Sequence, residues 1–244
     1  MAAALGVGLR PGDVALSLGT SGTAYTVTAE PTADSRGFVA GFADATGRFL
    51  PLVCTMNATH VTERFGRALG VDPAQLDELA LAAPAGASGM VLLPYLSGER
   101  TPNRPDATGA IAGITADFTP ADLARAAYEG VVCGLLDGLD ALRAATSDGR
   151  GSESRTFLVG GGARSPAYRR IVADLSGMPI TIPAGEEHVA IGACVQAAAV
   201  LHQCSPDEIA SAWALGEGDI IEPDPRVDRV ALRARYAELR DRTP

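Results

Sequence analysis

Lysine is absent from this sequence of 244 residues, in which all basic residues are arginine. A Walker A phosphate loop needs its lysine, so that class of nucleotide-binding motif is excluded. The formal net charge is −9, and no run of basic residues with interleaved aromatics occurs. A chain of this charge repels phosphate backbones and anionic lipids, which argues against nucleic acid and membranes as partners.

Cysteine and histidine are also scarce. The four cysteines (Cys54, Cys133, Cys194 and Cys204) form no CxxC pair, and the three histidines are isolated. No Cys/His ligand set for a metal arises from this spacing, and free thiols are typical of a reducing cytoplasm. No stretch reaches the roughly 20 apolar residues of a membrane-spanning helix. We therefore expect a cytoplasmic protein without a metal site of its own.

Apolar residues make up 47% of the chain, and Gly and Ala are abundant, so a closely packed core is expected. The start, residues 13–53, has strand-like alternation and predicts two hairpins. The rest alternates helical and strand patterns, which indicates an α/β fold. Helices are expected over 57–69, 73–81, 120–145, 166–176 and 189–202, and strands over 90–93, 156–159 and 180–182.

The long helix predicted over 120–145 carries glycine at every fourth position: Gly130, Gly134 and Gly138. Each glycine costs a helix about 1 kcal/mol relative to alanine. Close packing of another element against the helix backbone is the preferred explanation.

A first loop that could carry chemistry is the small-residue turn Leu18-Gly19-Thr20-Ser21-Gly22-Thr23. Backbone N–H groups and two hydroxyls in such a turn can surround anionic oxygens. An ordinary hairpin selects the same residues, and on this motif alone it is the favoured interpretation.

A second loop, residues 159–166, reads Val-Gly-Gly-Gly-Ala-Arg-Ser-Pro. A strand runs into three glycines and then into a helix with Ser165 at the N-cap and Pro166 in the first turn. Close approach of backbone to a flat or anionic ligand would explain the glycines, and so would a crowded strand-to-helix turn. The spacing is not that of the dinucleotide motif GxGxxG.

A third loop, residues 94–103, holds Glu99 and Arg100 between two prolines. The pair could read a ligand hydroxyl or phosphate, and a structural ion pair that fastens the loop is an equal alternative. We assign neither residue a catalytic role.

Taken in order, these loops resemble the FGGY carbohydrate kinases. Residues 12–22, Gly-Asp-Val-Ala-Leu-Ser-Leu-Gly-Thr-Ser-Gly, are similar to the phosphate loop of their C-terminal domain. Residues 95–102, Tyr-Leu-Ser-Gly-Glu-Arg-Thr-Pro, resemble the middle loop of the xylulokinases within that family. Residues 129–135 resemble the family's long-helix signature, and residues 160–165 its adenosine loop. The resemblance covers about residues 1–201.

This resemblance implies an actin-like ATPase (ribonuclease H-like) domain: an α/β fold with a mixed sheet and flanking helices, and only the C-terminal of the family's two domains. We expect a nucleotide-binding domain over 1–205 and a helical extension over 206–244 that packs on it. The implied cofactors are ATP and Mg²⁺. By position, Gly19, Thr20, Ser21 and Gly22 would meet the β- and γ-phosphates, and Gly161, Gly162, Ala163 and Arg164 would border the adenosine.

The resemblance also implies what this chain lacks. The family's catalytic Asp precedes a segment like residues 1–8, so we expect no catalytic residue here, and the sugar would be held mainly by the missing N-terminal domain. The expected function is ATP-dependent phosphorylation of a sugar, and the resemblance of the middle loop indicates D-xylulose. The chain would be the nucleotide-binding half of a truncated or split kinase. The alternative is a non-catalytic remnant or a nucleotide-binding module without kinase activity.

Three further expectations complete the analysis. Another actin-like ATPase is disfavoured by the kinase-like middle loop. The segment Asn57-Ala58-Thr59-His60 replaces residues that are usually small in relatives, which questions the adenine geometry. The isolated chain is expected to expose an apolar face and to self-associate.

Overall fold

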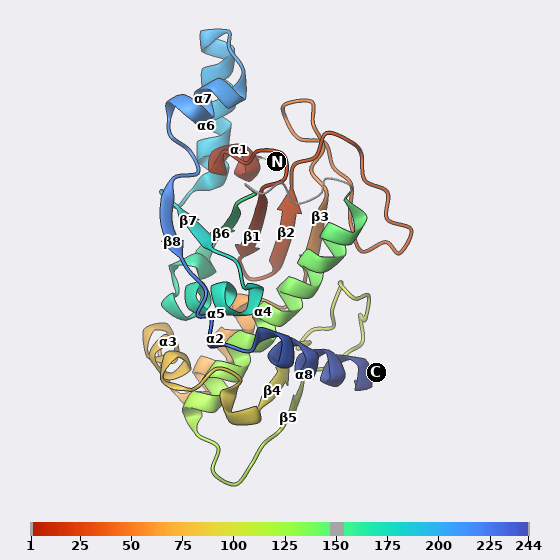
Figure 1. Cartoon of the computed structure of the whole chain (residues 1–244), viewed down its shortest axis with the longest axis vertical. Coiled ribbons are helices and arrows are strands. Elements are labelled where there is room, and N and C mark those ends of the chain that lie inside the picture. Colours follow the sequence, from red (N-terminus) through yellow and green to blue (C-terminus); the bar gives the residue numbers. More distant parts are fainter. Residues whose placement is uncertain (1, 147–153, 244) are drawn as a thin grey trace.

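A six-stranded mixed sheet forms the centre of the computed structural model, which describes residues 2–146 and 154–243 (Figure 1). The strand order is β3-β2-β1-β6-β7-β8, in which β1, β6 and β7 are parallel and the other neighbours antiparallel. The strands are β1 (Val14–Leu18), β2 (Gly22–Thr26), β3 (Leu52–Thr55), β6 (Thr156–Val159), β7 (Ile180–Pro183) and β8 (Gly218–Ile221). The predicted mixed α/β sheet is confirmed.

Alternating residues of β1 and β6 enter two separate cores. Leu16 and Leu158 pack with the main core, while Ala15 and Phe157 belong to a second cluster with Val7. This period of two is what a sheet covered on both faces requires. The helices are α1 (Ala2–Val7), α2 (Thr59–Leu69), α3 (Pro73–Ala82), α4 (Pro120–Ala145), α5 (Pro166–Ser176), α6 (His188–His202), α7 (Pro206–Ala212) and α8 (Arg229–Arg242).

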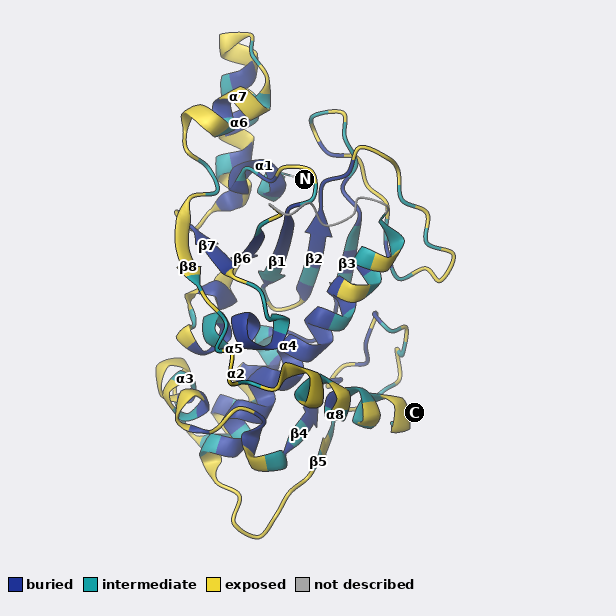
Figure 2. Ribbon diagram, viewed as in Figure 1, coloured by how far each residue is buried: buried dark blue, intermediate teal, exposed yellow. Residues whose placement is uncertain are grey.

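The long helix α4 runs through the middle of the molecule and is buried along most of its length (Figure 2). It begins with a capping box, in which the Thr119 hydroxyl accepts the Asp122 N–H and the Asp122 carboxylate accepts the Thr119 N–H. A Cβ on Gly130 would lie 2.4 Å from the Leu92 carbonyl oxygen, and one on Gly138 3.0 Å from Val53. The packing explanation of the glycine stripe is therefore confirmed.

A small second sheet joins β4 (Val91–Leu93) to β5 (Ala110–Ala112) beside α4. Strand β5 lies in the Pro- and Gly-rich segment 97–113, where no strand was expected. Helix α8 packs against β4 and α4 and is held there by Arg233, which pairs with Asp137 and Asp140. Residues beyond 205 thus contribute both a helix on the main body and, through β8, an edge strand of the central sheet.

The second predicted hairpin, over residues 38–53, is present as an irregular antiparallel pairing. The bridges Ala40–Leu52 and Ala43–Phe49 share one register, and the Leu50 N–H donates to the Phe42 carbonyl, but the only regular strand there is the start of β3 at Leu52. Asp34 accepts the N–H groups of Phe38 and Val39, and Asp44 accepts that of Arg48. Side chains that bond the local backbone in this way compete with a strand ladder.

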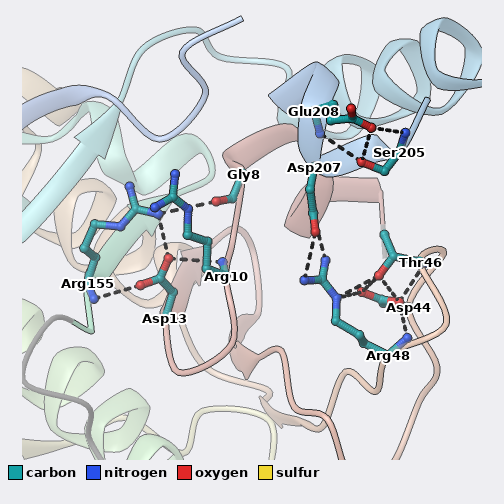
Figure 3. Close-up of polar contacts among 10 residues, drawn as sticks. All are labelled: Gly8, Arg10, Asp13, Asp44, Thr46, Arg48, Arg155, Ser205, Asp207 and Glu208. Atoms are coloured by element: carbon teal, nitrogen blue, oxygen red, sulfur yellow. Dashed lines mark hydrogen bonds and ion pairs between the residues drawn. The ribbon is translucent and has the colours of Figure 1, made fainter. Parts of the chain in front are cut away.

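Two polar clusters fasten this part of the fold (Figure 3). Buried Asp13 accepts the backbone N–H and the guanidinium of Arg155, at 2.9 and 2.7 Å, and so joins the starts of β1 and β6. Arg48 lies between Asp44 and Asp207, and so ties the loop before β3 to α7. The Asp13–Arg155 cluster thereby fixes the starts of the parallel strands β1 and β6 relative to one another.

Helices α6 and α7 extend away from the sheet (Figure 1). Only His188, Gly192, Val195 and Ala199 of α6 are buried, and α6 crosses α1 closely: a Cβ on Gly192 would lie 1.8 Å from the Ala2 carbonyl oxygen. Val200 is 80% exposed and Leu201 76%. None of the described helices alone has the length and apolarity to cross a membrane; α6 and α7 meet that test only as a pair bent by 110°.

Candidate functional site

The candidate site lies where the connections of two neighbouring parallel strands diverge. From β1 the chain turns back into β2 on one side of the sheet, whereas from β6 it continues through the short helix η2 (Gly161–Arg164) and α5 to β7 on the other side. The carboxyl ends of β1 and β6 lie side by side because Ser17 is in register with Val159. In open α/β sheets, ligands bind in the crevice at such a switch point.

The structure brings the first two sequence-predicted loops together at this point. The turn Gly19–Gly22 follows β1 and the glycine loop Gly160–Arg164 follows β6. A Cβ on Gly160, whose φ is +85°, would lie 2.7 Å from the Leu18 carbonyl oxygen, and one on Gly162 2.7 Å from the Leu18 side chain. Crowding against the end of β1 thus explains two of the three glycines.

Gly161 differs from its neighbours, because a Cβ there would meet nothing within 4 Å. Its backbone is open on the side where the crevice lies, and packing within this chain does not require a glycine. A ligand that approaches the backbone closely would require one. Ala163 is buried, and Ser165 caps α5 as predicted, since its hydroxyl accepts the Tyr168 N–H at 3.1 Å.

The turn Gly19–Gly22 has an uneven distribution of polar groups. The carbonyl oxygens of Gly19 and Thr20 accept hydrogen bonds from the start of α2. Within the described residues, the N–H groups of Thr20 and Ser21 have no hydrogen-bond partner, and both residues are exposed. Adjacent free backbone donors and two hydroxyls suit an anion such as phosphate.

A hollow of about 520 Å³ opens between the glycine loop and the start of α6. Its lining includes Ser17, Gly160, Gly161, Arg164, Glu186 and His188. Arg164 pairs with Glu186 at 2.5 Å, but both side chains are about two-thirds exposed, so the pair adds little stability. Arg164 therefore stands at the rim, free to exchange Glu186 for an anionic ligand.

His188, at the first position of α6, is a buried polar residue in the lining of this hollow. Burial lowers the pKa of its imidazole, and its Nδ1 has no partner among the described residues. No local motif singles out His188, since its burial depends on the crossing of α1 over α6.

The third loop has a fastening role, but not by the ion pair that the sequence suggested. Glu99 is buried, and its carboxylate accepts the N–H groups of Met56 and Arg100 at 2.6 and 2.7 Å. Arg100 is exposed, and in the described parts of the chain it forms no ion pair with Glu99. The carboxylate serves as an acceptor for backbone donors around it.

Asn57 completes this attachment. It is buried, accepts the Leu96 N–H at 3.1 Å, and donates to the Gly98 carbonyl at 2.7 Å and to Glu99 at 2.9 Å. The bulk that seemed out of place in the sequence thus binds the third loop to the end of β3. Thr59 and His60, in the same segment, contact the turn Gly19–Gly22. No local sequence pattern indicates this contact.

Over residues 2–146 and 154–243, no group of three or more His, Cys, Asp or Glu side chains is placed to hold a metal ion.

Comparison with known proteins places this geometry among sugar kinases. A sequence profile of the FGGY family of carbohydrate kinases, C-terminal domain, matches residues 14–201. The xylulose kinase of Streptomyces coelicolor is 42% identical over 243 residues, which is 100% of this chain and 48% of the relative. The gluconokinase of Bacillus subtilis is 30% identical over 201 residues, 77% of this chain and 38% of that protein.

Solved structures agree. The crystal structure of xylulose kinase from Bifidobacterium adolescentis matches with a TM-score of 0.82 and 43% identity, covering 98% of this chain and 46% of that one. The actin-like ATPase fold expected from the sequence is confirmed. The chain spans about half the length of the curated relatives that it matches along its whole length.

Proposed function

Because this chain belongs to the FGGY family of carbohydrate kinases, we propose that it is the nucleotide-binding half of an ATP-dependent sugar kinase whose substrate is D-xylulose. The product would be xylulose 5-phosphate. The observation that carries the proposal is the switch point, where the turn with the unpaired N–H groups of Thr20 and Ser21 follows β1, and the loop with the open backbone of Gly161 follows the neighbouring strand β6.

The residues present fit ATP. Gly19, Thr20, Ser21 and Gly22 would hold the β- and γ-phosphates through backbone donors, and Gly161, Gly162, Ala163 and Arg164 would border the adenosine. ATP–Mg²⁺ supplies the phosphoryl group for transfer to a sugar hydroxyl. The residues of this chain contribute binding and orientation, and we assign none of them the proton transfer.

The sugar and its catalytic base belong, in this proposal, to a domain outside these 244 residues. The curated xylulose kinases are about twice as long as this chain. Helix α6 carries no charged residue apart from its histidines, yet Val189, Val200 and Leu201 are exposed. A helix that is apolar on all sides is normally buried, so we propose that another domain covers it and that the chain alone self-associates there.

Two lesser parts of the proposal concern boundaries and location. The division between a domain over 1–205 and an extension over 206–244 stays a prediction. The cytoplasm is our proposed location, and the four free cysteines suit that compartment.

The test is calorimetric titration of the chain with ATP–Mg²⁺, together with a D-xylulose phosphorylation assay on the same preparation. We expect binding without turnover. Gly161→Val should abolish binding while the chain stays folded, because the added side chain enters open space. The control is Ala231→Val on exposed α8, which should bind as the unaltered chain does.

Each outcome has a distinct meaning. Phosphorylation of xylulose by the chain alone would contradict the need for a second domain. Absence of ATP binding would reject the nucleotide-binding half and favour a non-catalytic remnant, which is the alternative function. Binding that Gly161→Val leaves intact would remove the glycine loop from the site.

A further inference from the structure

The turn between β1 and β2 is attached to the start of α2 by two of its carbonyl groups, those of Gly19 and Thr20. The Gly19 oxygen accepts the Thr59 N–H at 3.0 Å and the Thr59 hydroxyl at 2.9 Å. The Thr20 oxygen accepts the Ala58 N–H at 3.3 Å and lies 2.9 Å from Nδ1 of His60. A carbonyl can only accept, so this last bond requires the proton of the imidazole at Nδ1.

These bonds fix the direction of the neighbouring N–H groups. A trans peptide unit is planar, with its C=O and N–H on opposite sides. The only cis peptide bond in the described chain precedes Pro102. With the Gly19 and Thr20 carbonyls directed at α2, the N–H groups of Thr20 and Ser21 must face away from α2.

From this geometry we infer that Thr59 and His60 are positioning residues for the phosphates of the nucleotide, because they hold the turn Gly19–Gly22 with its N–H donors facing outwards. The inference rests on the nucleotide site proposed above and deepens it. Neither residue needs to touch the ligand.

The local structure of α2 supports this role. The helix has no side-chain cap at its N-terminus, where Ala58 occupies the N-cap position. The N–H groups of Ala58 and Thr59, at the N-cap and the first helical position, find their acceptors in the turn. The attachment therefore serves helix and turn together, and weakening it frees both.

Thr59 also reaches the second loop. Its methyl group would lie 3.1 Å from a Cβ placed on Gly162, so it packs against the glycine loop, while its hydroxyl bonds the turn. One side chain therefore sets the spacing between the two loops of the candidate site. Two substitutions distinguish the methyl contact from the hydroxyl bond. Thr59→Val keeps the methyl group and removes the hydroxyl, whereas Thr59→Ser keeps the hydroxyl and removes the methyl group.

The experiment compares ligands with and without phosphates on the 244-residue chain. ATP–Mg²⁺ affinity is measured by calorimetry and adenosine affinity by NMR titration. For Thr59→Val and for His60→Ala we expect an approximately fivefold loss of ATP–Mg²⁺ affinity, the effect of one lost hydrogen bond, with adenosine affinity unchanged. Thr59→Ser should retain ATP affinity. Arg67→Gln, exposed in the last turn of the same helix, is the matched control.

Thermal unfolding of every variant separates positioning from folding. Unchanged ATP affinity in both Thr59→Val and His60→Ala would overturn the inference, and so would equal losses for ATP and adenosine accompanied by a lower Tm. If the unaltered chain binds no ATP, the nucleotide site itself fails, and this inference fails with it. ATP binding that is indifferent to these substitutions rejects the positioning role alone.

Discussion

Helices α4 and α6 are both rich in alanine and other apolar residues, yet they are buried to very different extents. α4 is surrounded by α2, α3, α5, β3, β4 and α8, and its glycines allow close approach of those neighbours. α6 meets α1 and α7 along one stripe, and most of its remaining residues are exposed (Figure 2). The apolar composition of a helix therefore limits how much of it can be buried, and the elements packed around it determine how much is buried.

Introducing an aspartate in place of an apolar residue in each helix gives the strongest test of this difference in burial. Leu139→Asp in α4 places an unpaired carboxylate in the core, and we expect a loss of more than about 4 kcal/mol in the free energy of unfolding, measured with urea. Val200→Asp in α6 should change that free energy by less than about 0.5 kcal/mol and reduce self-association in analytical ultracentrifugation. Strong destabilisation by Val200→Asp would show that the α6 face is already covered within the chain.

A methyl group tests the close packing of α4. Gly130→Ala should destabilise the fold by roughly 2 to 3 kcal/mol, since the added Cβ collides with the backbone oxygen of Leu92 and outweighs the better helix propensity of alanine. Gly161→Ala, where the Cβ meets open space, should leave the urea midpoint unchanged. Equal midpoints for the two variants would mean that β4 can shift away from α4 at little cost.

The helix starts provide the smallest contrast, because α4 has a capping box, whereas the N-cap residue of α6, Glu187, makes no side-chain cap hydrogen bond. Thr119→Ala should cost about 1 kcal/mol, and Glu187→Ala nothing measurable. The pKa of Asp122 is lowered by hydrogen bonds from Thr119 and from Ser88. A carboxyl with a depressed folded pKa stabilises above its unfolded pKa and loses that contribution as the pH falls through the folded value.

Urea midpoints measured between neutral pH and pH 3 check this direction. The unaltered chain should lose stability with falling pH, and Asp122→Asn should remove part of that dependence. A pH profile that is identical in Asp122→Asn would exclude the capping carboxylate as a contributor.

Much of the fold was readable from local pattern, because caps and periodicity are short-range signals. The helix over 120–145 and the strand over 156–159 have the predicted bounds. The hairpin expected over 38–53 forms only through isolated bridges, because Asp34 and Asp44 bond the local backbone in a way that the apolar alternation does not reveal. Strand β5 was missed because it is short and only half-buried within a polar segment.

The family, the α/β order and the two glycine-containing loops could be predicted from the sequence, since these depend on residue type and local spacing. The three-dimensional packing shows that Gly160 and Gly162 are glycines because they crowd against the end of β1, while Gly161 is open. It also shows that Glu99 and Asn57 fasten a loop. It alone joined Thr59 and His60 to the turn about 40 residues away. Contacts of that separation depend on how strands and helices stack, and no local pattern encodes them.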